Sequence, residues 1–396
     1  MRKIYRADAK IGSFISALLL SGIAMGLYKG IQDNYLAEIV GIDAFERGIV
    51  EFFRELPGFL VIFFLAWMYR FSESRIFKIG LGLMIAGITG FVFIQPGKAA
   101  VIALMVLYSA GEHIIMPVRT SISLDLAQKD KGGAALGITS ALGHAGNIAG
   151  FVMVSVLFFI YAKTDINKIF QFKTVFAASA ALMTAALLVS LAIKDTGQKA
   201  ARRRFYFSKK FSKYYILELF YGARKQIFIT FAPYVLILHY GANTAVISLL
   251  LAISALFGTL ASPLIGKLID HVGYRLVMIV DTLILIVVCF FYGFSHRLFP
   301  MHIAFYVVCV NYILDAIISV ASMANNVYVQ DIASNQEEIT ATISTGISIN
   351  HVFSIFIALW GGLLWKIAGI ETLFLFSALL GLINTLYAAT IRKGSR

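Results

Sequence analysis

Four positively charged side chains lie inside long apolar stretches of this chain: Lys29, Arg54, Arg224 and Lys225. Placing a cation at the centre of a lipid bilayer costs about 2.5–3.5 kcal/mol, so such a residue is kept where it faces protein or water, usually beside a partner. Charged residues held in this way mark a binding site or a pathway for a polar solute. We therefore expect these cations to indicate the functional region of the molecule.

The first two apolar stretches carry acids at depths that match their cations. If the two stretches form a hairpin and rise about 1.5 Å per residue, Lys29 and Glu55 lie at one level, and Asp33 and Arg54 lie near each other. The spacing predicts the ion pairs Lys29–Glu55 and Asp33–Arg54, and it leaves Glu51 without a predicted partner. The cluster is either a network that braces two helices or an outer gate and part of the binding site.

A second set of polar residues lies near the middle of later stretches, in both halves of the chain. Because they converge on one level, we expect a substrate site there. The candidate substrate-binding residues are Arg224, Lys225, His113, Asn311, Asp315, His144, Asn350 and His351, and the candidate proton-coupling acids are Glu112, Asp315 and Glu51.

Two of these assignments have alternatives. A lone buried histidine often only completes the packing of a core, so His144 or His351 alternatively serves as a structural hydrogen-bonding group. Arg224 and Lys225 are adjacent and point about 100° apart on a helix, so one of them faces the centre of the site. We choose Arg224 as the substrate contact.

Composition identifies the class of protein. Hydrophobic residues make up 59% of the 396 residues and charged residues 14%, whereas soluble domains carry about 45–50% and about 25%. Segments long enough to cross a bilayer recur along the chain, and none alternates as a β-barrel strand does. We predict an all-α integral membrane protein with twelve transmembrane helices, at 12–37, 47–69, 76–95, 99–121, 134–160, 173–193, 214–238, 245–265, 276–295, 301–326, 340–364 and 371–391.

The net charge of +13 follows the predicted topology. Lys and Arg concentrate before the first span, after the second, and in the connector 194–213, and they are sparse in the segments on the other side. This distribution predicts that both termini lie in the cytoplasm. We expect the protein in the plasma (inner) membrane. The basic surplus therefore indicates orientation and some attraction to lipid headgroups, and it does not indicate nucleic acid. Cys289 and Cys309 lie within spans and behave as small apolar residues.

The chain divides into two similar halves. The predicted domains are 1–193, a basic cytoplasmic linker at 194–213, and 214–396. Aligning Asp125-Leu126-Ala127 with Asp331-Ile332-Ala333 without a gap brings His144 onto Asn350. Parallel six-helix repeats are a known architecture of transporters, so we expect two pseudo-symmetric six-helix bundles. The linker is either a simple connector or a regulatory segment.

One loop carries a recognisable motif. The sequence Gly266-Lys-Leu-Ile-Asp270-His-Val-Gly273-Tyr-Arg275 closely resembles the loop signature of the major facilitator superfamily. Gly266 would allow close helix approach, Gly273 would make the turn, and Asp270 and Arg275 would supply charge. The resemblance implies a conformational latch at these four residues. It also implies that spans 1, 4, 7 and 10 line a cavity and that spans 3, 6, 9 and 12 face lipid.

These observations together predict a secondary active transporter that moves a small solute by alternating access, with the two bundles rocking about a central site. We expect coupling to protons and a substrate that is an organic anion or a zwitterion. The alternatives are an exporter of drugs or amphiphiles and a lipid-handling or sensing protein of the same fold. The chain lacks a nucleotide-binding loop of the Gly-x-x-x-x-Gly-Lys type and the metal motif His-Glu-x-x-His. We expect no enzymatic activity, no cofactor and no metal, and a monomer in the lipid bilayer.

Overall fold

Helices account for nearly all of the regular structure in the described part of the chain. The computed structural model describes residues 4–6, 11–68, 70–128, 130–193 and 207–391, and within them the extended structure is one isolated bridge between Tyr5 and Ala127. Of the basic linker predicted at 194–213, residues 194–206 lie outside the described residues.

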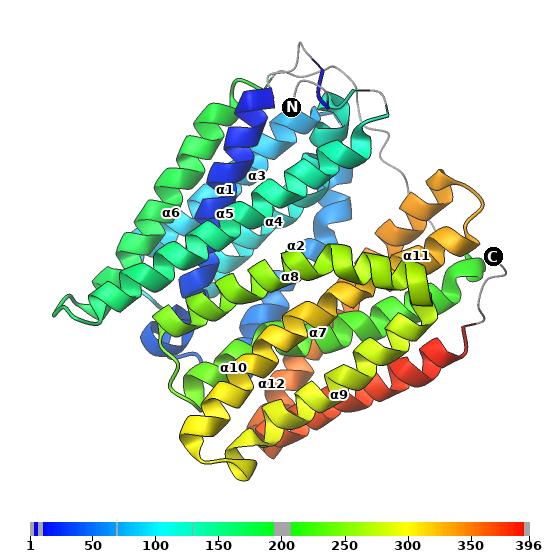
Figure 1. The fold of residues 1–396 in the computed structure, drawn as a ribbon. Coiled ribbons are helices and arrows are strands. Elements are labelled where there is room, and N and C mark those ends of the chain that lie inside the picture. Colours follow the sequence, from blue (N-terminus) through cyan, green and yellow to red (C-terminus); the bar gives the residue numbers. More distant parts are fainter. Residues whose placement is uncertain (1–3, 7–10, 69, 129, 194–206, 392–396) are drawn as a thin grey trace. The chain divides into compact units, whose positions relative to one another are not determined.

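Within each half of the chain the helices follow one another with short connections (Figure 1). In the first half they are α1 (Ile11–Asn34), extended by the π-helical η1 (Tyr35–Val40), then α2 (Ala44–Trp67), α3 (Glu73–Phe93), α4 (Lys98–Leu126), α5 (Gly132–Tyr161) and α6 (Lys168–Ser190). In the second half they are the short η2 (Lys209–Phe211), α7 (Ser212–Leu238), α8 (Thr244–Val272), α9 (Tyr274–Leu298), α10 (Met301–Ser319), η3 (Val320–Ser322), α11 (Met323–Ile332) and α12 (Gln336–Ala389).

The helices bear out the predicted all-α membrane protein. Nine segments of the described residues are long and apolar enough to cross a bilayer. The long α12 counts once among them although Gly369, with φ of +84°, divides it into two runs. The helices α2 and α7 are of spanning length and stand outside the nine; they are the helices that carry Arg54, Arg224 and Lys225. The protein is therefore a multi-pass membrane protein.

Local sequence explains where α2 and α9 begin. Asp43 and Glu46 form a capping box, in which the Glu46 amide donates to Asp43 Oδ1 (2.7 Å) and the Asp43 amide donates to Glu46 Oε2 (3.0 Å). These two contacts satisfy backbone donors that a helix start leaves open. Gly273, with φ of +87°, makes the turn between α8 and α9, a conformation that residues with a Cβ rarely adopt.

The described chain forms two compact units. Unit 1 comprises Met1–Gly41, Leu56–Arg202 and Asn243–Ala252, and unit 2 comprises Ile42–Glu55, Arg203–Ala242 and Ile253–Arg396. The first half of α2 thus belongs to unit 2, and the start of α8 belongs to unit 1. The domains predicted with boundaries at 193 and 214 are continuous in sequence, whereas each unit contains one short segment from the other half of the chain.

Glycines bring α1 and α5 into close contact in unit 1. A Cβ on Gly150 would lie 2.4 Å from the Ile23 carbonyl oxygen, and one on Gly146 would lie 2.9 Å from the Gly22 Cα. Small residues four apart let membrane helices approach this closely. The same packing continues to α6, where Ser179 Oγ donates to the Ala24 carbonyl (2.7 Å). This close contact fixes the helix that carries Lys29.

In unit 2, α12 packs against both α7 and α9. The Tyr292 hydroxyl of α9 donates to the Ala232 carbonyl of α7 (2.7 Å) and is fully buried. Gly48 of α2 lies against α12, because a Cβ there would be 2.4 Å from the Ala358 carbonyl oxygen. These contacts hold α7 and the first half of α2 at defined positions along α12.

Candidate functional site

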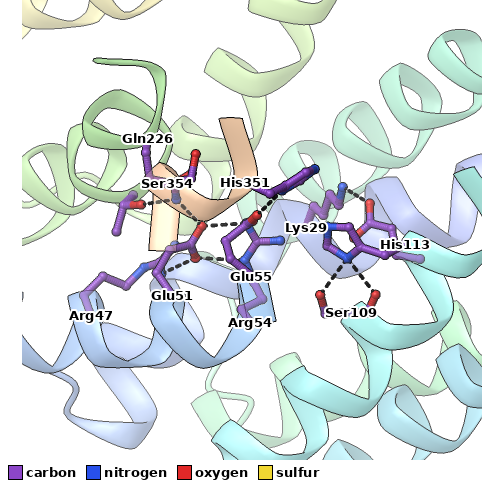
Figure 2. A network of polar contacts seen from close by, with 12 residues as sticks. Lys29, Arg47, Glu51, Arg54, Glu55, Ser109, His113, Gln226, His351 and Ser354 are labelled. Atoms are coloured by element: carbon purple, nitrogen blue, oxygen red, sulfur yellow. Dashed lines mark hydrogen bonds and ion pairs between the residues drawn. The ribbon is translucent and has the colours of Figure 1, made fainter. Parts of the chain in front are cut away.

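The first half of α2 carries a buried charge network in unit 2. Arg47 Nη1 donates to Glu51 Oε2 (2.8 Å), and Arg54 Nε donates to the same oxygen (2.8 Å). Arg47 is 1% exposed and Glu51 is fully buried. Glu51 therefore forms ion pairs with two guanidinium groups at once, each within one helical turn of it (Figure 2).

This network, the α2 charge network, extends to two other helices of unit 2. Gln226 of α7 donates its Nε2 to Glu51 Oε1 (2.7 Å). Glu55 makes an ion pair with Arg54, and its Oε2 lies 2.9 Å from His351 Nδ1 on α12. Every oxygen of the two carboxylates thus has a donor, as buried charged groups require. We define the network by Arg47, Glu51, Arg54, Glu55, Gln226 and His351.

Arg224 of α7 is occupied by an acid of α9. Its Nη2 lies 3.0 Å from Asp281 Oδ2, and the two side chains are 2% and 9% exposed. The guanidinium also lies 5.1 Å from the ring centre of Tyr221. Because Arg224 is buried against a carboxylate, its charge is balanced within unit 2.

Lys225, the next residue, has a different environment. Its side chain is exposed, and its Nζ lies 5.8 Å from the ring centre of Tyr221. Among the described residues no carboxylate lies within ion-pair distance of it. Asp315 of α10 is half-buried, likewise has no ion-pair partner among the residues described, and feels the positive charges of Lys225 and Arg224. A cation and an acid thus stand near each other in unit 2 without direct contact.

A buried acid lies two turns before Lys225 on α7. Glu218 Oε1 accepts from Asn325 Nδ2 of α11 (2.9 Å), and its Oε2 accepts a longer contact from Asn350 Nδ2 of α12 (3.5 Å). Glu218 is 7% exposed. Asn350 also packs against the backbone of Gly222 and accepts from Ser354 Oγ (3.3 Å). We call Glu218, Asn325 and Asn350 the Glu218 cluster.

In unit 1, Lys29 forms an ion pair with Glu112 of α4 (Figure 2). The expected pairing of Lys29 with Glu55 is therefore corrected: Glu55 is bound by Arg54 and His351, and Lys29 by Glu112. The depth of a residue along the first hairpin gives no information about an acid on α4. Asp33 lies half-buried near the end of α1.

Two other predicted site residues, His113 and Asn311, make contacts within their own helices. His113 is buried, and its Nδ1 lies 2.9 Å from the Ser109 carbonyl oxygen and 3.1 Å from Ser109 Oγ. Asn311 Nδ2 donates to the Val307 carbonyl (2.8 Å). His144 of α5 is exposed and feels the positive charge of Arg119. Local bonds of this kind are typical of residues that satisfy a helix core.

The latch motif has a clear turn and weaker charge contacts. Arg275 Nη2 donates to the Ala389 carbonyl at the end of α12 (2.5 Å). Asp270 is exposed and, among the described residues, has no ion-pair partner. The prediction that Gly266 allows close helix approach is wrong, because a Cβ there would meet no atom within 4 Å. Gly273 makes the predicted turn.

Arg47 and Asp281 are not among the residues that the sequence predicted at the site. Arg47 stands four residues before Glu51, a spacing that allows an ion pair on a helix. Asp281 lies in the predicted span 276–295, which was expected to face lipid. The presence of a deep cation on one span and a single acid on another could have indicated that Arg224 pairs with Asp281.

A family model described as Major Facilitator Superfamily matches residues 14–215 and 214–396. The chain belongs to the major facilitator superfamily, whose fold is that of membrane transporters. No curated protein matched the sequence.

Solved structures give the same fold. The nucleoside transporter NupG is 14% identical with a TM-score of 0.74, over 96% of this chain and 99% of that one. A D-xylose-proton symporter is 13% identical with a TM-score of 0.76, over 97% and 98%. A POT family transporter solved with a thioalcohol-conjugated peptide is 12% identical with a TM-score of 0.74, over 95% and 94%. At these identities the likeness concerns the fold.

Proposed function

We propose that this protein is a secondary active transporter that moves a small organic anion or zwitterion by alternating access, coupled to protons. The observation that supports the substrate class is Lys225, a cation in the interior of α7 whose side chain is exposed and, among the described residues, is not paired with a carboxylate. A deep ammonium group without a protein counter-ion suits a carboxylate or phosphate of a substrate.

The choice of Lys225 replaces the expected choice of Arg224. Arg224 already donates to Asp281 and is 2% exposed. A substrate anion would have to displace that buried carboxylate, which would leave Asp281 without its counter-ion at a cost of about 3–5 kcal/mol. Binding of an anion at Lys225 would have no such cost, because no protein carboxylate would be displaced.

The proton-coupling role falls to Asp315 among the three expected acids. Glu51 is held by Arg47 and Arg54, and Glu112 is held by Lys29. Protonating either of them would leave a buried or half-buried cation uncompensated. Asp315 faces no such constraint in the described structure, so it can gain and lose a proton during transport.

The alternative, an exporter of cationic drugs or amphiphiles, is less well supported. Such a site needs deep acids that are available to a positively charged substrate. Glu51, Glu55 and Glu112 each have a cationic partner in the structure, so three of the deep acids are already neutralised. We infer a monomer in the plasma (inner) membrane with both termini in the cytoplasm, and a protein that acts without cofactor or catalysis.

Uptake into proteoliposomes tests the proposal. A panel of small carboxylates, phosphate esters and zwitterionic amino acids, first ranked by thermal shift, is followed as labelled solute with and without an inward proton gradient. Lys225→Gln should reduce uptake at least about tenfold, whereas Lys163→Gln, at an exposed lysine just after the end of α5, should leave uptake unchanged.

The coupling role has its own readout in the same vesicles. Asp315→Asn should remove accumulation driven by the gradient and retain exchange of labelled for unlabelled solute. Wild-type uptake by the Lys225 variant would overturn the substrate class, and gradient-driven accumulation by the Asp315 variant would overturn the coupling role.

A further inference from the structure

The Glu218 cluster combines a buried carboxylate with donors that carry no charge. Among the described residues, no Lys, Arg or His lies within ion-pair distance of Glu218, and its direct partners are Asn325 and Asn350. The other deep glutamates of the described chain, Glu51, Glu55 and Glu112, each contact a cation. An ionised carboxylate that is buried without a counter-ion is strongly disfavoured. Glu218 therefore lacks the cationic partner that the other deep glutamates of the described chain have.

The surroundings of Glu218 are rich in oxygen atoms. Asn325 and Asn350 each carry an amide oxygen beside the nitrogen that now contacts Glu218, and an Asn side chain can turn to present either group. Ser354 Oγ lies 3.3 Å from Asn350 Oδ1. The contact from Asn350 to Glu218 is long, at 3.5 Å, so it is easily exchanged for another partner.

The backbone beside the cluster changes from α-helix to a 3₁₀ turn and back to α-helix. The α-helix α10 ends at Ser319, the 3₁₀ turn η3 follows, and Asn325 lies in the first turn of α11. The Ser319 carbonyl at this break accepts from the Tyr221 hydroxyl of α7 (3.3 Å). A 3₁₀ stretch between two α-helical segments often marks a functional position, and here one of its carbonyl groups bonds to a side chain of α7.

We propose that Glu218, Asn325 and Asn350 form a site for a monovalent cation, a proton or Na⁺, that neutralises Glu218. This inference rests on the proposed transport function and adds a cation site separate from Asp315. The titratable groups that face Glu218 are Tyr214 and Lys225, both on α7. Lys225 lies two turns away on the same helix, so the charge of Glu218 acts on the residue assigned to the substrate anion. Neutralising Glu218 frees the full charge of Lys225 for that anion.

Binding to the purified full-length protein tests this site without any transport substrate. Cys289 of α9 is buried and Cys309 of α10 is half-buried, and both are free thiols of unit 2, so a thiol-reactive fluorogenic dye reports the unfolding of this unit. Melting temperatures are compared in NaCl, KCl and choline chloride at equal ionic strength, and then across pH. A bound ion should raise the melting temperature by about 3–5 °C for each tenfold increase above its dissociation constant.

Substitutions assign the response to the cluster. Glu218→Gln keeps the size of the side chain and mimics the neutralised state, so it should abolish the response to Na⁺ and remove the part of the pH response that Glu218 contributes, leaving the part that comes from His239. Asn350→Ala should weaken the affinity about tenfold or more. Asp315→Asn, the matched control, should keep the response, which separates this site from the proposed coupling acid.

Infrared pH-difference spectroscopy distinguishes the two ions. A protonated Glu218 gives a carboxyl C=O band that is lost at high pH and is absent from the Glu218→Gln protein, whereas a Na⁺ site gives a sodium-dependent shift of the carboxylate bands. A wild-type protein that responds to neither ion, or a Glu218→Gln protein that keeps the full response, would overturn the site. Absence of transport by a protein that still binds the cation would instead overturn the proposed function alone.

Discussion

Arg224 of α7 and Asp281 of α9 form an ion pair with 3.0 Å between Nη2 and Oδ2, and both side chains are buried. The pair explains why an acid occurs on a helix whose other residues are almost all apolar. It also explains how unit 2 holds a guanidinium among its apolar side chains without a substrate. The neighbouring Lys225 has no equivalent acid in the described structure, and this difference separates a structural cation from a candidate binding cation.

Breaking this pair from one side should be costly. Arg224→Met leaves Asp281 buried without a counter-ion and should lower the free energy of unfolding by about 3–5 kcal/mol. The double variant Arg224→Met with Asp281→Leu should recover most of that loss, because both charges are gone. Thermal unfolding of the single and double variants measures the coupling. A double variant as unstable as the single one would contradict the pairing.

Glu51 should be a structural acid rather than a proton carrier. Glu51→Gln leaves Arg47 and Arg54 without a shared carboxylate and should cost about 3–5 kcal/mol of stability. Glu46→Gln on the same helix keeps the acceptor of its capping box and should cost less than about 1 kcal/mol. The measurement is the melting temperature of the two purified variants. Equal stability of both would argue against the α2 charge network as a structural element.

The contact between α1 and α5 should reject any side chain. Gly150→Ala places a Cβ 2.4 Å from the Ile23 carbonyl oxygen, and because backbone atoms cannot move aside, the change should cost about 1–3 kcal/mol. Gly137→Ala, in the same helix, meets no atom within 4 Å and should stabilise by up to about 1 kcal/mol through helix propensity. Opposite signs in a thermal melt are expected. A destabilising Gly137→Ala would show that propensity does not govern this helix.

The stability of unit 2 should depend on pH through His239, which follows the end of α7. Burial, together with the charge of His296, lowers the pKa of His239 below its ordinary value of 6.5, and Glu371 opposes this in part. Well above pH 6.5 the imidazole is neutral both folded and unfolded, so no stability is lost. As the pH falls below 6.5 the unfolded chain takes up the proton first, and the folded state loses stability.

Melting curves between pH 8 and pH 5.5 measure this effect. The fall in melting temperature should be smaller for His239→Gln than for the wild type. His271→Gln, an exposed histidine at the end of α8, should follow the wild type. An identical pH profile for the His239 variant would contradict the assignment.

The fold could be predicted from the sequence because the apolar segments and the basic loops carry the topology. The twelve predicted spans agree with the helices once the interruption at Val320–Ser322 and the turn at Gly369 are taken into account. The spans predicted at 340–364 and 371–391 leave a gap that contains Gly369, so the sequence predicts this break. Nothing in the residues at 320–322 indicates the 3₁₀ turn.

The candidate site was harder to predict because pairing depends on three-dimensional neighbours. Depth along one hairpin suggested Glu55 for Lys29, but Glu112 on α4 is the partner found. Adjacent residues Arg224 and Lys225 could not be ranked, because the deciding residue, Asp281, lies on another helix. Glu218 lies near the start of the predicted span 214–238, and its two partners, Asn325 and Asn350, come from other helices.

The first half of α2 belongs to unit 2, and this bears on how the chain is made. The ribosome delivers residues 42–55 long before α7 and α12, which supply Gln226 and His351 to the α2 charge network. Arg47 and Arg54 must therefore enter the bilayer before those helices exist. Glu51 contacts both arginines from the same helix, and Glu55 of the same helix contacts Arg54. The segment of α2 that is inserted therefore carries one acid for each cation, and membrane insertion does not have to wait for the second half of the protein.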